Sequence, residues 1–432
     1  FKGLFYFAGF NAKSSRAYNL GIMNEFDIDI FDEVLNTTKS LYAAKAKELN
    51  DKELYFRTVL RKSLYPDWRI FRKTSRVWIT LGGIFTLNIT MYETIDTNGK
   101  RKRFTYYHDE KLKQISKFKY DLDVIKLALK FYFEGNIIPD SLKRIFPSKQ
   151  LINYYLKAFN LKEKIEKKND EILANIESNL QKTNSKLMLE MDDFYIFHKS
   201  ERIRKMRVRQ VIMHTVNGSK LSNIINMFFT KNIDEATTKF NDMQFIKTTV
   251  SKQLNKFKSN KEIIVNGDGA RWIKHLANEL NASYSLDLFH IKKAINDTFG
   301  ANKFASKENK IYFKNNINYC LNKPWKNAFS DAVFTKNELM FHTLYNEFFA
   351  YSSVINIPKV IHQNVQNFYK FIKNNSLTVF KNNENDSSYT EHFVYNSFKK
   401  HIKKDQSLYC FELIKLRVIY KNIAKNQATL FY

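Results

Sequence analysis

The chain has 432 residues, enough for one to three domains with a substantial core. Hydrophobic residues make up 44% and aromatic residues 15% of it, which excludes an intrinsically disordered chain. The net charge of +28 indicates a polyanionic partner, with nucleic acid favoured; a compositional bias towards Lys, Asn, Ile and Phe is the alternative explanation. No run of about 18 apolar residues exists, so no membrane span is expected.

Two cysteines, Cys320 and Cys410, offer neither a disulfide framework nor the spacing of a zinc site. A reducing, cytoplasmic location is therefore expected. The N-terminal segment is apolar but lacks the basic start of a signal peptide. Because Met23 opens an ordinary helical pattern, we predict that residues 1–22 are a non-native upstream extension and that residues 23–75 form an N-terminal helical region.

The hydrophobic period changes at residue 76. Val77 and Ile79 begin a period-two alternation, and Asn98-Gly99 is a strong hairpin-turn signal. These features predict a small β unit over residues 76–110. The cations around it either contact phosphates or are solvated charges of an edge strand; they are Arg72, Lys73, Lys100, Arg101, Lys102 and Arg103.

Residues 111–161 show a helical pattern broken by Gly135 and by Pro147. We predict helices at 122–133, 139–146 and 149–161, an arrangement that favours a DNA-binding helix-turn-helix over a plain three-helix packing unit. Candidate DNA contacts on its third helix are Lys149, Gln150, Asn153 and Lys157. The highly charged residues 162–186 are predicted to be a solvated helical connector.

From residue 187 onward, strands and helices follow in an informative order. Three strands come first, and a helix then separates each further strand from the next. Met206 and Val208 share one face of the second strand, and Lys205, Arg207 and Arg209 share the other. This order predicts an α/β, ribonuclease H-like mixed sheet flanked by helices. The expected elements are strands 187–197, 204–216 and 220–229, helix 234–257, strand 262–266, helix 270–280, strand 283–289 and a helix from 290.

Enzymes of this fold that transfer phosphoryl groups hold two Mg²⁺ ions on carboxylates from two adjacent strands and a later helix. Asp192 in the first strand and Asp268 at the tip of a later one fit the strand positions. Asp193 should face the other side of the sheet because side chains alternate. Gly267 and Gly269 are expected to let a cation or phosphate approach the backbone.

The third carboxylate is predicted to be Glu391. Its alternative role is local, because Ser388 and Glu391 have the spacing of a capping box at the start of a helix. Rival third ligands are Glu384, Asp386 and Glu412.

Three motifs, MDDFYI at 191–196, GDGARWIK at 267–274 and LDLFHIKK at 286–293, resemble the transposases of the Lre-type insertion sequences. These are relatives of the Mutator-like group in the DDE superfamily. The similarity extends to RVWITLGGIF at 76–85 and TEHFV at 390–394, and it covers most of residues 24–420.

This resemblance implies that Asp192, Asp268 and Glu391 are the catalytic acids and bind two Mg²⁺ or Mn²⁺ ions. It also implies that Asp287 and His290 match a (Cys or Asp)-x-x-His signature supporting the active site or the DNA end. By spacing alone, His290 is a histidine at a helix start. A mostly helical insertion, about 295–380, is expected within a catalytic domain spanning 187–432.

The resemblance implies a DNA transposase that binds the terminal repeats of its element and target DNA, both double-stranded. It would cut with metal ions and join the 3′-hydroxyl to the target, as a homo-oligomer on DNA in the nucleoid, with no membrane partner. Two alternatives stay open: an inactive relic that only binds DNA, and a nuclease without strand transfer. Phosphate contacts near the site, each with solvated surface as its alternative, are Lys205, Arg207, Arg209, Arg271 and Lys274.

Overall fold

The computed structural model divides the chain into two compact units, 1–161 and 162–432. The residues described are 30–117, 119–135, 142–182, 185–217, 220–233, 239–257, 262–303, 305–354, 357–381, 389–402 and 409–432. The upstream extension predicted at residues 1–22 lies outside them. Among the described residues, no helix is long and apolar enough to cross a membrane.

Unit 1 opens with a continuous helical segment, as predicted, and then forms a three-stranded antiparallel sheet in the order β1-β2-β3. The sheet begins at Arg69, earlier than the predicted residue 76, and the Asn98-Gly99 turn joins β2 to β3 as expected. The described elements are α1 Ile30–Tyr55, η2 Phe56–Leu60, α2 Arg61–Leu64, β1 Arg69–Thr80, β2 Gly83–Ile95, β3 Arg101–Thr105, α3 Glu110–Lys117, α4 Leu122–Glu134 and α5 Lys149–Ala158.

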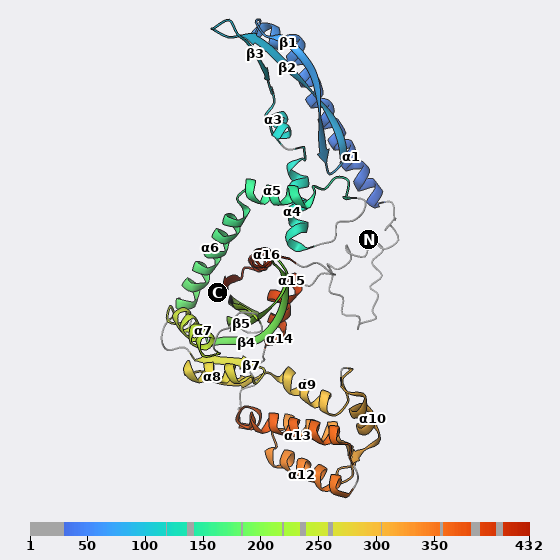
Figure 1. The fold of residues 1–432 in the computed structure, drawn as a ribbon, viewed down its shortest axis with the longest axis vertical. Coiled ribbons are helices and arrows are strands. Elements are labelled where there is room, and N and C mark those ends of the chain that lie inside the picture. Colours follow the sequence, from blue (N-terminus) through green and yellow to red (C-terminus); the bar gives the residue numbers. More distant parts are fainter. Residues whose placement is uncertain are drawn as a thin grey trace. The chain divides into compact units, whose positions relative to one another are not determined.

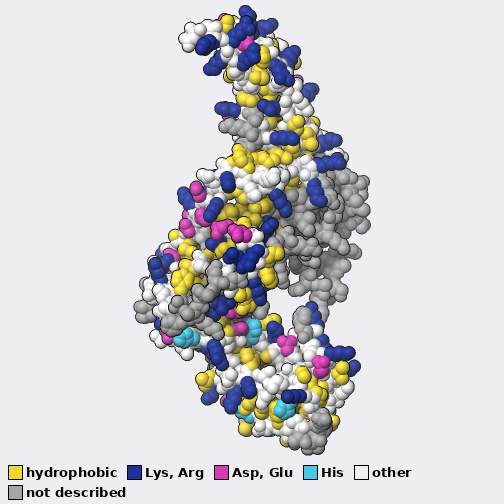
Figure 2. Space-filling view, viewed as in Figure 1, with side chains coloured by type: hydrophobic (Ala, Val, Ile, Leu, Met, Phe, Trp, Pro, Cys, Tyr) yellow, Lys and Arg dark blue, Asp and Glu magenta, His cyan; other side chains and the backbone are white. Residues whose placement is uncertain are grey.

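Helix α1 runs beside this sheet (Figure 1) and buries Ala46 and Leu49 against Trp78 and Leu87. The Trp78 indole donates a hydrogen bond to Asp121 at 3.2 Å, so the largest core residue keeps its polar atom satisfied. Figure 2 shows Lys and Arg side chains gathered around the strands of this unit. Exposed cations there are Arg69, Arg72, Lys73, Arg76, Lys100, Arg101, Lys102 and Arg103.

The predicted three-helix pattern is only partly present. Asp121 caps the start of α4, and Gly135, with φ of 63°, ends it. Ser148 caps α5. Between them, residues 142–146 form turns rather than the predicted helix 139–146, whose first three residues lie outside the described ones. Pro147 disfavours helical geometry in the residue before it, which leaves too short a run to nucleate a helix.

Unit 2 contains the mixed sheet that the element order predicts. Its described strands are β4 Leu187–Lys199, β5 Ile203–Asn217, β6 Lys220–Asn232, β7 Ile263–Gly267, β8 Ser283–Leu286 and β11 Ala428–Phe431, with a small hairpin of β9 Ile317–Asn318 and β10 Lys323–Pro324. Its described helices are α6 Leu161–Lys182, α7 Lys239–Leu254, α8 Arg271–Glu279, α9 Leu288–Thr298, α10 Lys307–Asn315, α11 Trp325–Phe334, α12 Glu338–Val354, α13 Lys359–Lys373, η4 Leu377–Lys381, α14 Thr390–Phe393, η5 Val394–Lys399, α15 Lys400–Ile402 and α16 Phe411–Ile423.

The strand order in the main sheet is β11-β6-β5-β4-β7-β8. Strands β4, β5 and β6 pair antiparallel as a meander, whereas β7 and β8 run parallel to β4. The chain is therefore a mixed α/β protein, as predicted. Strand β11 was not predicted: it adds to the far edge of β6 in parallel, after a separation of about 200 residues.

Helices cover both faces of the sheet. Helices α6, α7 and α8 pack on one face, and η5 and α16 pack on the other. Helix α6 buries Ile172, Ile176 and Leu180 in the first of these cores, so the solvated connector predicted for 162–186 is instead a packed helix of unit 2. The many charged residues between them made this apolar stripe hard to recognise in the sequence, although its residues recur every four positions.

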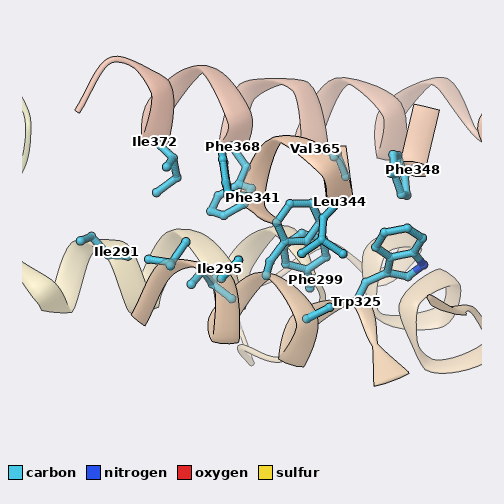
Figure 3. Packing of buried hydrophobic residues seen from close by; sticks show 14 of the residues in the cluster. Ile291, Ile295, Phe299, Trp325, Phe341, Leu344, Phe348, Val365, Phe368 and Ile372 are labelled. Atoms are coloured by element: carbon cyan, nitrogen blue, oxygen red, sulfur yellow. The ribbon is translucent and has the colours of Figure 1, made fainter. Parts of the chain in front are cut away.

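The predicted helical insertion forms a core of its own from α9 to η4. Phe299, Phe341 and Phe368 meet between its helices (Figure 3), with ring centroids of Phe299 and Phe368 5.5 Å apart. Aromatic rings packed edge to face fill such a core densely. The helix whose start the capping-box spacing of Ser388 and Glu391 predicts corresponds to α14, which continues into η5 and α15.

Burial and the neighbouring Lys425 and Lys421 lower the pKa of His401 in α15 to about 3. Below pH 6.5 the unfolded chain therefore binds a proton that the folded chain does not, and stability is lost as pH falls towards 3. From pH 7 to pH 5, we expect wild type to lose about 1–2 kcal/mol more unfolding free energy than His401→Gln. Urea unfolding at both pH values tests this; equal losses would contradict it.

Candidate active site on strand β4 at the end of strand β7

The two predicted aspartates lie next to each other at the centre of the sheet. The parallel ladder between β4 and β7 ends at the pair Met191 and Gly267, so Asp192 and Asp268 occupy the next position on each chain. Neighbouring strands are about 4.8 Å apart, which brings the two backbones together. Asp192 is 8% exposed, and Asp268 is half-buried and accepts a hydrogen bond from the Ala270 amide at 2.8 Å.

Asp193 lies on the opposite face of β4 from Asp192, as alternation predicts. It is half-buried and paired across the ladder with Arg209. Burial raises the pKa of the Asp193 carboxyl, and the charge of Asp268 raises it further, while Arg209 and Arg207 act against this. The carboxyl of Asp193 therefore interacts electrostatically with Asp268, although Asp193 lies on the face of the sheet that carries Arg207 and Arg209.

The glycines around Asp268 serve packing and backbone geometry. A Cβ on Gly267 would lie 2.7 Å from Cδ1 of Ile273, and Gly269 has φ of 92°. A Cβ on Gly269 would also meet the Phe371 ring at 3.4 Å. Packing against protein atoms on the Cβ side, and the positive φ of Gly269, therefore account for glycine at these two positions.

Replacing Gly267 by Ala should destabilise unit 2 by about 1–3 kcal/mol, since the methyl group would overlap the Ile273 side chain. Urea unfolding measures this change. Gly267→Ala combined with Ile273→Val removes the nearest atom, so the double variant should recover part of the loss. Additive losses would show that the contact with Ile273 is not the cause.

Helix α14, which contains Glu391, is attached to the Asp192 face of the sheet. The Thr390 hydroxyl donates a hydrogen bond to Glu190 at 2.6 Å, and Glu190 shares a face with Asp192 on β4. The Glu391 side chain, its capping partner Ser388, and the rivals Glu384 and Asp386 are not among the described groups. Glu412 is exposed on α16 and forms ion pairs with lysines on α6 and α16.

Glu190 is the centre of a buried polar network that the sequence reading missed. Its side chain is fully buried, and its Oε1 lies 3.1 Å from Nε2 of His214 and 2.9 Å from the Asn266 amide nitrogen that donates to it. Because buried charges need partners, these contacts and the one from Thr390 fix three elements around one carboxylate. Its position two residues before Asp192 was the available sequence signal.

Gln210 is the cross-strand neighbour of Asp192 and is fully buried. Neither its oxygen nor its nitrogen has a hydrogen-bond partner among the described residues. Carboxylates on two adjacent strand positions with an amide oxygen alongside form a donor set that suits Mg²⁺ or Mn²⁺, which prefer oxygen ligands. No group of three or more His, Cys, Asp or Glu side chains that could hold a metal occurs among the described side chains, which do not include Glu391.

Asp287 and His290 lie at the start of α9. Asp287 is buried, caps this helix through the Phe289 amide at 2.8 Å, and donates its own backbone amide to Gly267 at 2.9 Å. Asp287 thus joins the end of β7, through its backbone amide, to the start of the next helix, through its side chain. His290 is half-buried beside Phe289.

The cations predicted to contact phosphate differ in their location and in whether they are exposed. Lys205, Arg207 and Arg209 line one face of β5, and Arg271 is exposed at the start of α8. Lys274 instead donates to the Asn374 carbonyl at 2.8 Å, and burial lowers its pKa. Lys274 therefore ties α8 to the end of α13. In unit 1, Lys149, Gln150, Asn153 and Lys157 are all exposed on α5.

The fold and site define a mixed α/β protein with one acidic side chain within strand β4 and a second just after the end of the parallel strand β7. A family model matches residues 65–323, which is more than half of the chain, and the protein belongs to this uncharacterised protein family, UPF0236. The matched segment includes Asp192 and Asp268 and ends before Glu391. No curated protein matches the chain.

Proposed function

We propose that this chain is a DDE-type DNA transposase whose second unit has a ribonuclease H-like fold. The observation that supports this most is the strand order β6-β5-β4-β7-β8, with Asp192 and Asp268 at adjoining positions on β4 and β7. A helix that contains a third acid, Glu391, is hydrogen-bonded to the same face. Carboxylates from two strands and a helix suit two-metal phosphoryl transfer.

In this proposal, Asp192, Asp268 and Glu391 hold the metal ions through carboxylate oxygens. The ions, when bound, supply Lewis-acid activation of the attacking oxygen and stabilisation of the leaving oxygen. Glu190 positions the helix of Glu391 against the sheet. The cations on β5 and the exposed residues of α5 contact DNA phosphates, so affinity should fall steeply with salt.

The test is cleavage and strand transfer on a supercoiled plasmid that contains the DNA flanking the gene. The full chain is incubated with Mg²⁺ or Mn²⁺ and compared with Asp268→Asn. Metal-dependent joined products that vanish in the variant would support the transposase. Cleaved but unjoined products would instead indicate a nuclease. End-specific binding without any product from wild type would indicate an inactive relic.

A further inference from the structure

A strip of exposed aromatic side chains extends from the candidate site along β4. Tyr195 and Phe197 are 53% and 57% exposed, although aromatic side chains of this size usually bury most of their surface. Both lie on the face of Asp193, because side chains alternate along a strand. The strip therefore lies beyond Asp193 on the face of β4 opposite Asp192.

Cations on β5 face these rings. Tyr195 pairs across the ladder with Arg207, and Phe197 pairs with Lys205. The Lys205 ammonium lies 4.5 Å from the centroid of the Tyr195 ring, a cation–π distance. An exposed sheet surface that alternates rings and positive charges suits a polyanion with flat apolar groups, which is nucleic acid.

This surface is not needed to complete a core. The alternate residues Phe194 and Ile196 point to the opposite face, where they pack with η5 and α16. Strand β7 pairs only with residues 187–191 of β4, so the part of β4 that contains Tyr195 and Phe197 extends beyond it. The two rings can therefore be replaced without opening a cavity in the described core.

The spacing of the rings distinguishes unpaired DNA from a duplex. Residues two apart on a strand are about 6.7 Å apart. Stacked bases in a duplex rise by about 3.4 Å, so successive duplex bases cannot each meet one ring. Bases of a splayed, unpaired strand can, since its backbone is free to extend.

We propose that Tyr195 and Phe197 stack on unpaired bases of the DNA strand whose phosphate lies at Asp192 and Asp268, while Lys205 and Arg207 contact its backbone. Because the rings lie on the opposite face of β4 from Asp192, this strand passes around the edge of β4 beyond residue 191, where the pairing with β7 ends. The inference rests on the proposed function for the position of that phosphate. It adds a substrate requirement: the DNA next to the scissile phosphate is opened, and its bases leave the stack. Opening a duplex costs a few kcal/mol, which stacking on protein rings offsets.

The experiment measures binding of the full chain to a fluorescent oligothymidine and to a short duplex, in EDTA so that no cleavage occurs. Tyr195→Ala with Phe197→Ala should weaken oligothymidine binding by about tenfold per ring and leave duplex binding within about twofold. The exchange Tyr195→Phe with Phe197→Tyr keeps both rings and should bind as wild type does. Tyr319→Ala, an exposed tyrosine in the helical insertion, is the control for losing a surface ring.

Unchanged oligothymidine binding in the double alanine variant would overturn the inference, as would an equal loss for duplex. Tighter binding of an oligouridine with the same dependence on both rings would overturn the assignment to DNA. Asp268→Asn retains both rings and should bind oligothymidine at least as tightly as wild type. The binding experiment therefore tests the role of the two rings independently of whether the chain cleaves and joins DNA.

Discussion

For the proposed transposase activity, Asp192→Asn should lower metal-dependent DNA cleavage by about a thousandfold, whereas Asp193→Asn should lower it by less than about tenfold. The two residues are adjacent in sequence but lie on opposite faces of β4. Asp192 shares its face with Glu190 and the attached helix α14, and Asp193 faces Arg209. A metal held between Asp192, Asp268 and Glu391 loses a ligand only in the first variant.

Cleavage rates of both variants on one DNA substrate, at matched Mg²⁺ concentrations, test this prediction. Thermal unfolding of each protein is measured alongside, so that a folding defect is not mistaken for a catalytic one. Glu412→Gln is the control, because Glu412 is exposed and pairs with lysines. Loss of cleavage in Asp193→Asn with activity retained in Asp192→Asn would place the metal site on the other face.

Glu190→Ala should destabilise unit 2 by about 3–5 kcal/mol, the largest stability effect we expect from a single substitution. The substitution removes the acceptor that pairs with His214, Asn266 and Thr390 in the interior. Each of these polar groups would then stay buried without that partner, which typically costs about 1–3 kcal/mol per group, less where water enters.

Urea unfolding of wild type, Glu190→Ala and Glu190→Gln measures the effect. The glutamine variant keeps an oxygen acceptor and a similar volume, so it should lose clearly less stability than the alanine variant. The control Glu412→Gln should stay within about 0.5 kcal/mol because its side chain is on the surface. Equal stability of Glu190→Ala and wild type would show that the network adds nothing to the fold.

Local patterns predicted much of the fold. The alternation of Met206 and Val208 with Lys205 and Arg207 placed β5 correctly, and each of these side chains lies on the expected face. The Asn98-Gly99 turn and the Gly135 helix end were also confirmed. These signals depend on residues close in sequence, and they report backbone preferences that packing did not override.

Other features depended on distant contacts and were missed. The charge of α6 suggested a solvated connector, but its apolar stripe packs on the sheet, and its Asn169 exchanges two hydrogen bonds with Thr429 of β11. A four-residue strand that pairs with a segment about 200 residues earlier leaves little local signal. The packing around the glycines beside Asp268 was also missed, because the sequence does not show which side chains surround them.

The sequence by itself determined the order of strands β4 to β8 and the helices between them, the basic character of the chain, and the positions of Asp192 within a strand and Asp268 at the end of another. Only the tertiary structure decided which polar groups share a face with them. Glu190 finds its partners 24, 76 and 200 residues away, in strands β5 and β7 and in helix α14. Periodicity assigns a side chain to a face, but the groups that meet there come together only when the sheet is assembled.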